Sequence, residues 1–334
     1  MASVTPFSDE QSRALVNLEN RYQVWMEAER TLAALPYDLR KKQVGDRAYL
    51  YEIVDRGGNG RSLGPWSEEN AATFTAYRAR KSAAKLRSDA CRHIMRESAR
   101  LYRALRLPPL ANEAGAILRE ADLRRLLGEQ LLVVGTNAMV AYHVEAAGFI
   151  NGAPDETEDF DMAWTARRPE TAPDTLWNML KAVDPSFTVN IERTFQARNL
   201  KAYAVEILVA PSRADTFHSA DRPKPVPLPE QEWLLNGVPV DHVVACRDGS
   251  PARIVAPDPR WYALQKVWMS RQAKRNPLKR AKDAKQGRAL LDAVHVAMPQ
   301  YPLNAAFRSE LPEALTGLFA EWDAHRPPGG VAEW

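Results

Sequence analysis

The sequence predicts an α+β fold, with a mixed sheet in the middle of the chain and helical regions before and after it. Apolar residues recur at helical spacing from residue 8 to residue 35, and neither proline nor glycine interrupts residues 67–107. Short β-branched or alternating segments lie between residues 131 and 256, and helical composition returns after Pro257. Because helices precede and follow this mixed segment, we expect a central sheet with helical flanks.

The N-terminal helical region is predicted to cover residues 1–110. Its first helix begins with Ser8 and has Gln11 three positions later, which is a capping-box pattern. The segment RAYLYEIVDRGGNGRSLGP predicts a β-hairpin near residues 47–63, because GGNG supplies turn residues between strand-forming residues. Pro108-Pro109 ends the region.

The long helix expected over residues 67–107 has ten Lys and Arg against four acids. One interpretation is a solvated helix that covers the core. The other is a surface that binds RNA or another polyanion. The basic residues are Arg78, Arg80, Lys81, Lys85, Arg87, Arg92, Arg96, Arg100, Arg103 and Arg106.

The predicted core spans residues 111–256, and a C-terminal helical region spans 257–334. In the core, QLLVVG and DFDMAWTA are expected strands with the helix NAMVAYHVEAAGF between them. Further strands are expected at FTVNIER, KAYAVEILVA, GVPVDHVVA and ARIVA. The C-terminal helices are expected at PRWYALQKVWMSR, ALLDAVHVAM and LPEALTGLFAEW.

Composition excludes several classes of protein. Hydrophobic content of 45% and charged content of 26% are typical of a globular chain. No run of roughly 18 apolar residues occurs, so we expect no membrane association. The N-terminus has no secretory pattern, and Cys91 and Cys246 cannot form a disulfide framework, so we expect a cytoplasmic protein.

Charge is unevenly distributed, although the net charge is only +3. Residues 271–288 contain eight basic residues and one acid, whereas residues 155–161 contain five acids in seven positions. Segments of opposite charge often meet around a phosphate ligand and its metal ions. The two segments are therefore expected to meet at one site.

The segment TEDFDMAW places Asp159 and Asp161 two residues apart. In a strand these side chains project to one face and Phe160 projects to the other. Two carboxylates in that position favour a hard divalent cation, which prefers oxygen ligands. Glu206 is the expected third acid, because it is the one acid in the apolar strand AYAVEILV and would be costly there without a cation or cleft.

Glu192 and Asp241 are weaker alternatives for the third acid, because polar residues flank both.

The segment VVGTNA predicts a strand that ends at Gly135 and turns into a helix. Glycine lets backbone N–H groups approach a phosphate closely, and a helix N-terminus favours negative charge. Thr136 and Asn137 can add side-chain hydrogen bonds. This turn alone is common to many folds, and it becomes more specific when a D-x-D strand follows it.

Together these motifs resemble those of the nucleotidyltransferase superfamily with a DNA polymerase β-like palm. In that superfamily a glycine turn precedes a pair of acids, and a third acid lies on a later strand. The chain is more closely similar to a group of bacterial nucleotidyltransferase-fold proteins without an assigned substrate, over YLYEI, VVGTNAMVAY, TEDFDMA, VEILVAP and PDPRWYALQKVWMS. It also looks distantly like abortive-infection-type nucleotidyltransferase toxins.

The resemblance implies that Asp159 and Asp161 bind two Mg²⁺ or Mn²⁺ ions. Glu206 would complete one metal site and help to activate the attacking hydroxyl. The chain departs from the family pattern in two ways. Thr-Asn follows the glycine instead of the commoner Gly-Ser, and the interval from Gly135 to Asp159 is longer than in minimal members.

The resemblance also implies a binding site for a nucleoside triphosphate. Gly135 and Thr136 would hold the β- and γ-phosphates, with Asn137 beside them. Lys266 would pair with the triphosphate. Lys282 and Asp283 would lie near the cleft.

The implied function is metal-dependent transfer of an NMP group from an NTP to an acceptor hydroxyl. The basic segments favour RNA, including tRNA, as acceptor, and a protein side chain or a small hydroxyl compound are the alternatives. A toxin or defence effector with an antitoxin partner is one biological form of this function. The competing interpretation is a catalytically idle nucleotidyltransferase fold that binds nucleotide or nucleic acid.

Overall fold

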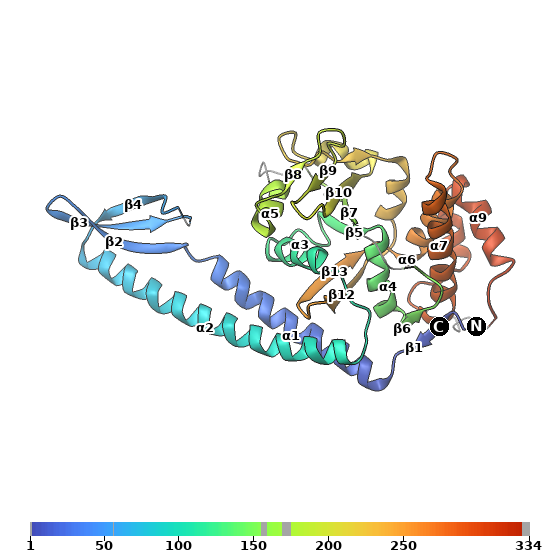
Figure 1. Cartoon of the computed structure of the whole chain (residues 1–334), viewed down its shortest axis with the longest axis horizontal. Coiled ribbons are helices and arrows are strands. Elements are labelled where there is room, and N and C mark those ends of the chain that lie inside the picture. Colours follow the sequence, from blue (N-terminus) through green and yellow to red (C-terminus); the bar gives the residue numbers. More distant parts are fainter. Residues whose placement is uncertain (1, 56, 155–158, 169–174, 329–334) are drawn as a thin grey trace. The chain divides into compact units, whose positions relative to one another are not determined.

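The computed structural model describes residues 2–55, 57–154, 159–168 and 175–328. It confirms an α+β fold with a mixed sheet and helices on either side of it in the chain. The chain divides into two compact units (Figure 1), each described separately below. Unit 1 comprises Met1–Glu19 and Ala99–Trp334, and unit 2 comprises Asn20–Ser98.

Helices α1 and α2 pass from one unit into the other. α1 (Asp9–Ala33) begins with the expected capping box: the Gln11 backbone N–H donates to Ser8 Oγ at 3.2 Å, and the Ser8 N–H donates to Gln11 Oε1 at 2.8 Å. These two bonds satisfy donors that a helix start otherwise leaves unpaired. α2 (Glu68–Ala104) covers most of the long proline-free segment.

Unit 2 joins parts of α1 and α2 to a three-stranded antiparallel sheet of β2 (Asp38–Val44), β3 (Arg47–Ile53) and β4 (Gly60–Pro65). Strand β2 was missed in the sequence analysis, because DLRKKQV has few apolar residues to mark it. Leu39, Leu50 and Tyr77 form a small core under the sheet. Glu29 ties the two helices together by accepting hydrogen bonds from Ser88 Oγ (2.6 Å) and an Arg92 guanidinium nitrogen (2.8 Å).

Unit 1 is built around a six-stranded mixed sheet with the order β5-β7-β10-β9-β8, in which β11 also pairs with β10. Strands β7 and β10 are parallel, as are β10 and β11, and the other pairs are antiparallel. The strands are β5 (Leu131–Val134), β7 (Asp159–Trp164), β8 (Thr188–Val189), β9 (Gln196–Arg198), β10 (Ala204–Val209) and β11 (Val226–Pro227).

Two smaller strand pairs complete unit 1. β1 (Val4–Pro6) pairs with β6 (Gly148–Ile150), and β12 (Val240–Ala245) pairs with β13 (Pro251–Ala256). β13 lies beside α3 (Asn112–Leu123) and β5, and β12 lies beside α4 (Met139–Glu145), as Figure 1 shows. The 3₁₀ helices are η1 (Thr136–Ala138), η2 (Pro211–Thr216) and η3 (Pro229–Leu235), and the helix before β8 is α5 (Thr175–Val183).

The C-terminal helices are α6 (Pro259–Ser270), α7 (Pro277–Ala297), α8 (Ala305–Glu310) and α9 (Glu313–Asp323). Asp258 and Asn276 cap α6 and α7 by accepting hydrogen bonds from the backbone N–H groups of Arg260 and Leu278. Gly287 lies where α7 crosses α6, and a Cβ there would come within 2.7 Å of the Ala263 carbonyl oxygen. The glycine therefore permits the close approach of the two helices.

Most expected strands are present, but the segment FTVNIER is not one continuous strand. Only Thr188 and Val189 in it pair as β8. Strand β9, which lies between β8 and β10, was not expected, because its three residues are too few to show a pattern. Within the described residues, none of the helices combines the length and apolarity that crossing a bilayer requires.

Buried apolar side chains alternate with less buried residues in β7 and β10, and this alternation sets which face of the sheet the acids share. Phe160 and Met162 in β7 have no exposed surface, and neither do Val205, Ile207 and Val209 in β10. Burial of these apolar side chains holds the strands in register, so that the intervening residues project to the other face.

Truncation of Phe160 to alanine is expected to destabilise unit 1 by about 3–5 kcal/mol, because it leaves a cavity in a close-packed core. Urea unfolding followed by tryptophan fluorescence measures the loss. Ile191→Ala, at a side chain that is 94% exposed, should change the free energy of unfolding by less than about 0.5 kcal/mol. Equal unfolding midpoints for Phe160→Ala and the unsubstituted protein would contradict the packing described here.

Candidate active site

Strands β7 and β10 bring three carboxylates to one face of the sheet. In the parallel register Asp161 is the partner of Glu206, and Asp159 is the partner of Ala204. Neighbouring strands lie about 4.8 Å apart, and residues two apart on a strand share a face. The sheet therefore places Asp159, Asp161 and Glu206 on one face.

The glycine turn after β5 lies directly against these acids. Val134 pairs with Asp161 across the antiparallel strands, and Gly135 follows it with φ of 67°. A Cβ at Gly135 would come within 2.2 Å of Asp161 Oδ2, so no other residue fits beside this carboxylate. Asn137 fixes the turn to β7 by donating from Nδ2 to the Asp159 carbonyl oxygen at 2.9 Å.

Tyr262 of α6 contacts the same turn. Its hydroxyl donates a hydrogen bond to the Gly135 carbonyl oxygen. Burial raises the pKa of Tyr262 well above its ordinary value, and the nearby Asp283 and Asp161 add to this effect. The phenol therefore stays protonated and keeps its role as donor.

The pKa of Asp161 is raised in this site, where negative charges are crowded together. Burial raises the pKa of Asp161 from 3.8 to about 7, and repulsion from Asp159 and Glu206 adds to the shift. Lys266 and Lys279 act in the opposite direction. A carboxyl group in this environment gains from a cation placed next to it.

The fit to a metal ion rests on the two aspartates. Among the described residues, no three Asp, Glu, His or Cys side chains are grouped closely enough to hold a metal by themselves. The Glu206 carboxylate accepts a hydrogen bond from Gln196 Nε2 at 2.6 Å. Mg²⁺ commonly takes one or two carboxylates and completes its shell with water and substrate phosphates. Asp159 and Asp161 meet that requirement, and Glu206 is the neighbouring third acid.

The basic side of the site comes from α7 and includes a residue that the sequence analysis did not select. Lys279 Nζ lies 3.7 Å from Asp159 Oδ2, and both side chains are partly exposed. Lys279 precedes Asp283 by one helical turn, so the two side chains lie on the same side of α7. Its position within the basic run was visible in the sequence, but its helical phase relative to β7 was not.

Lys266 and Asp283 form a buried ion pair at 3.0 Å between α6 and α7. Arg275 Nε also contacts Asp283, at 2.9 Å. Lys266 is only 5% exposed, so its charge is engaged inside the helical region in this structure. Lys282 lies nearby on α7, where burial, together with Lys266, lowers the pKa of its ammonium group.

Gln286 is a further residue of the site that sequence reasoning missed. Its side chain is fully buried, and Nε2 lies 3.4 Å from Thr136 Oγ1. Its Oε1 atom has no hydrogen-bond partner among the described residues. A glutamine in a basic helix gives no sequence signal for such a contact.

The remaining candidates lie elsewhere. Asp241 forms an ion pair with Arg253 at 2.6 Å, and Glu192 is exposed in a bend. The acids of the 155–158 segment lie outside the described residues.

Comparison with known proteins gives one family match. A family model described as nucleotidyltransferase matches residues 112–312, which is more than half of the chain. A search of curated proteins found no match. The crystal structure of an antigenic nucleotidyltransferase-like protein from Paracoccidioides brasiliensis aligns with 66% of this chain and 92% of its own, at 16% identity and a TM-score of 0.35. A likeness of that size transfers no residue role.

The raised pKa of Asp161 predicts the pH dependence of stability in the absence of divalent cations. Below pH 3.8 the carboxyl group is protonated in both the folded and the unfolded chain. As the pH rises from 3.8 to about 7, the unfolded chain loses the proton first, so this group progressively destabilises the fold, fully so above about 7. Asp161→Asn should therefore be more stable than the unsubstituted protein at pH 8, with the difference vanishing toward pH 4.

Urea midpoints measured in EDTA from pH 4 to pH 8 test this expectation. Asp184→Asn is the control of opposite sign, because hydrogen bonds from Ser186 lower the pKa of Asp184 and its stabilisation is lost as the pH falls. A pH-independent difference between Asp161→Asn and the unsubstituted protein would refute the assignment.

Removal of Asp283 is expected to destabilise the C-terminal helices by about 3–5 kcal/mol, because Asp283→Ala leaves the Lys266 charge buried without its partner. The double variant Lys266→Met/Asp283→Leu removes both charges and should recover most of that loss. The free energy of unfolding in urea measures both effects. A double variant that is less stable than Asp283→Ala would argue against a buried ion pair.

Proposed function

The chain belongs to a nucleotidyltransferase family, and we propose that it transfers an NMP group from an NTP to an acceptor hydroxyl in a polymerase β-like palm. The observation that carries the proposal is the convergence of Asp159 and Asp161 on the turn at Gly135. Carboxylates for a divalent cation and a backbone turn for phosphates are the two parts that this chemistry needs.

Each part of the site has an assigned role in the transfer. Asp159 and Asp161 hold Mg²⁺ or Mn²⁺, which when bound neutralises charge on the triphosphate and lowers the pKa of the attacking hydroxyl. The backbone at Gly135 and Thr136 holds the β- and γ-phosphates, while Lys279 adds positive charge beside Asp159.

The reaction forms one bond and breaks one bond at the α-phosphorus. The acceptor oxygen attacks it, the bond to the bridging oxygen of the β-phosphate breaks, and pyrophosphate leaves with the electron pair. Glu206 accepts the proton of the acceptor hydroxyl, because its partly exposed carboxylate neighbours Asp161. The side chains contribute through positioning and charge, and none forms a covalent intermediate.

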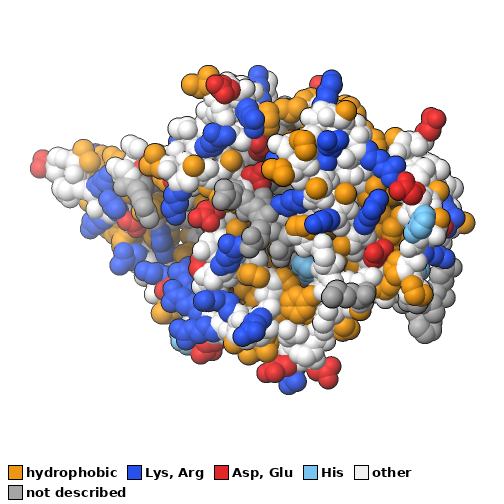
Figure 2. Space-filling view, turned by 45° about the vertical axis from the view of Figure 1, so that its right-hand side comes forward, with side chains coloured by type: hydrophobic (Ala, Val, Ile, Leu, Met, Phe, Trp, Pro, Cys, Tyr) orange, Lys and Arg blue, Asp and Glu red, His pale blue; other side chains and the backbone are white. Residues whose placement is uncertain are grey.

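RNA, including tRNA, is the proposed acceptor because of the charge of unit 2. Its 79 residues contain fifteen Lys and Arg against ten Asp and Glu, which gives this unit a charge of +5 in a chain of +3. Positive charge of this kind attracts the phosphate backbone. Figure 2 shows Lys and Arg side chains spread over the visible face of the molecule, with a dense group at its lower left.

The sheet of unit 2 adds aromatic side chains to that charge. In the antiparallel register Arg40 opposes Tyr51, and Lys42 opposes Tyr49, so all four residues share one face. Lys42 Nζ lies 4.8 Å from the centre of the Tyr51 ring. Aromatic rings beside cations on a sheet can stack with bases while neighbouring charges contact phosphates.

Two observations favour a second function. Lys266 is paired with Asp283 rather than open to a triphosphate, and the described residues contain no ready three-ligand metal group. Both features suit a catalytically idle fold that binds nucleotide or nucleic acid.

Label transfer separates the two functions. The protein is incubated with each labelled NTP, Mg²⁺ or Mn²⁺, and total RNA or protein as acceptor. We expect labelled RNA, and we expect Asp159→Asn/Asp161→Asn to lower the rate by at least about a hundredfold, because both cation ligands are lost. Asp241→Asn, in a carboxylate paired to Arg253 away from the site, is the control. Failure to label any acceptor while RNA binding persists would favour the idle fold.

A further inference from the structure

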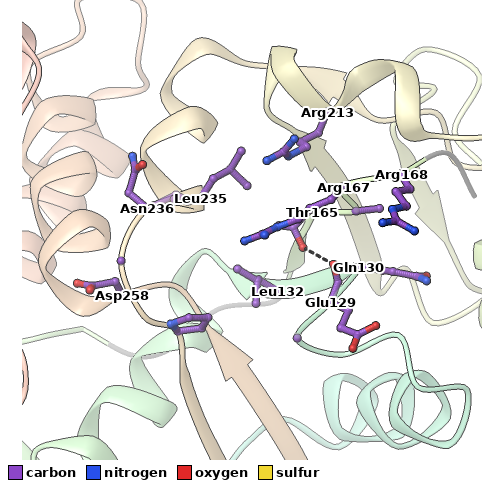
Figure 3. Close-up of a pocket in the computed structure, with 15 residues that line it drawn as sticks. Glu129, Gln130, Leu132, Thr165, Arg167, Arg168, Arg213, Leu235, Asn236 and Asp258 are labelled. Atoms are coloured by element: carbon purple, nitrogen blue, oxygen red, sulfur yellow. Dashed lines mark hydrogen bonds between the residues drawn. The ribbon is translucent and has the colours of Figure 1, made fainter. Parts of the chain in front are cut away.

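A second polar site lies at the opposite end of β7 from the aspartates. A cavity of about 510 Å³ lies there (Figure 3). It is lined by the segment that follows β7, by residues that precede β5, and by the end of η3. The Thr165 backbone N–H donates to the Gln130 carbonyl oxygen at 2.8 Å, which joins two of these segments at the cavity. Asp159 and Trp164 are five residues apart, so β7 separates the two sites by about 16 Å.

Three arginines supply the charge of this cavity. Arg167 and Arg168 follow β7, and Arg213 comes from η2. Figure 3 shows the guanidinium groups of Arg167 and Arg213 both reaching into the cavity, with Arg168 at its side. No carboxylate in the described part of the chain forms an ion pair with any of them, and Arg213 Nε is buried there without a hydrogen-bond partner.

The acids in the lining do not cancel this charge. Asp258 is already held by Arg260, at 2.7 Å, and also accepts a hydrogen bond from the Val238 N–H. Glu129 is exposed at the edge of the cavity. The cavity therefore keeps an excess of positive charge, which fits an anionic ligand.

Apolar side chains share the rest of the lining with Gln130, Thr165 and Asn236. Leu132 and Leu234 are buried, and Leu235 and Pro239 lie beside them. Apolar walls with a few convergent polar groups, at a volume of several hundred Å³, are typical of sites for small organic ligands. Inorganic phosphate alone would leave these walls without a partner.

We propose that this cavity binds a phosphorylated nucleoside, with the phosphate between Arg167 and Arg213 and the nucleoside against Leu132 and Leu235. Guanidinium groups match phosphate oxygens in charge and geometry. The phosphate belongs either to a free mononucleotide or to the end of an RNA chain. This proposal does not depend on the function proposed for the carboxylate site.

Ligand binding to this cavity can be measured while the carboxylate site is inactivated. Isothermal titration in EDTA, on the Asp159→Asn/Asp161→Asn background, uses AMP, a 5′-phosphorylated trinucleotide RNA, adenosine and inorganic phosphate as probes. We expect AMP or the trinucleotide to bind at least tenfold more tightly than adenosine or inorganic phosphate. Binding of AMP identifies a free nucleotide as the source, whereas binding of the trinucleotide alone assigns the cavity to an RNA end.

Arginine variants locate the site. Arg167→Gln and Arg213→Gln are each expected to weaken that binding at least tenfold, because each removes charge-assisted hydrogen bonds to the phosphate. Arg247→Gln, at an exposed arginine in the β12–β13 turn, should leave the affinity unchanged. Arg167 is exposed, so its variant tests the site even if Arg213→Gln fails to fold.

Two results would overturn the proposal. One is the absence of binding by both AMP and the trinucleotide. The other is binding that is equally strong in Arg167→Gln and Arg247→Gln. Neither result bears on label transfer by the carboxylate site, which is assayed separately with Mg²⁺.

Discussion

Electrostatic repulsion among carboxylates on two parallel strands is the constraint on which the site depends. The register of β7 and β10 sets Asp161 beside Glu206, with Asp159 two residues away on the same face. Burial and this crowding together raise the pKa of Asp161 to about 7. A fold that keeps such a cluster needs compensating groups around it, and the surrounding elements supply them: Gln196 donates to Glu206, and Lys279 lies beside Asp159.

The sequence predicted the parts of this cluster that local geometry determines. Alternation in a strand put Asp159 and Asp161 on one face, and a lone acid in an apolar strand singled out Glu206. The turn at Gly135 was predicted because strand, glycine and helix composition follow one another directly. Each of these inferences uses residues that are neighbours along the chain, so they need no knowledge of how distant segments pack.

The partners of the acids come from distant segments, and that is why the sequence did not reveal them. Gln196 lies on a three-residue strand, and Lys279 lies in a run where eight basic residues look alike. Which of them faces the carboxylates depends on the rotation of α7 against the sheet, and the contact of Gly287 with α6 helps to fix that rotation. The same packing pairs Lys266 with Asp283 and leaves Lys279 as the lysine next to Asp159.

Strand β7 thus separates two environments of opposite charge. Asp159 and Asp161 lie at its beginning, and Arg167 and Arg168 follow its end. The side chains of Phe160, Met162 and Trp164, which lie along β7, are buried. Through solvent, a separation of about 16 Å is roughly twice the screening length at physiological salt. Neither cluster can then neutralise the other, and each must be compensated by groups that bind locally. A cation and triphosphate at one end and an anion at the other are therefore compatible occupants, because filling one site does not remove the charge that draws a ligand to the second.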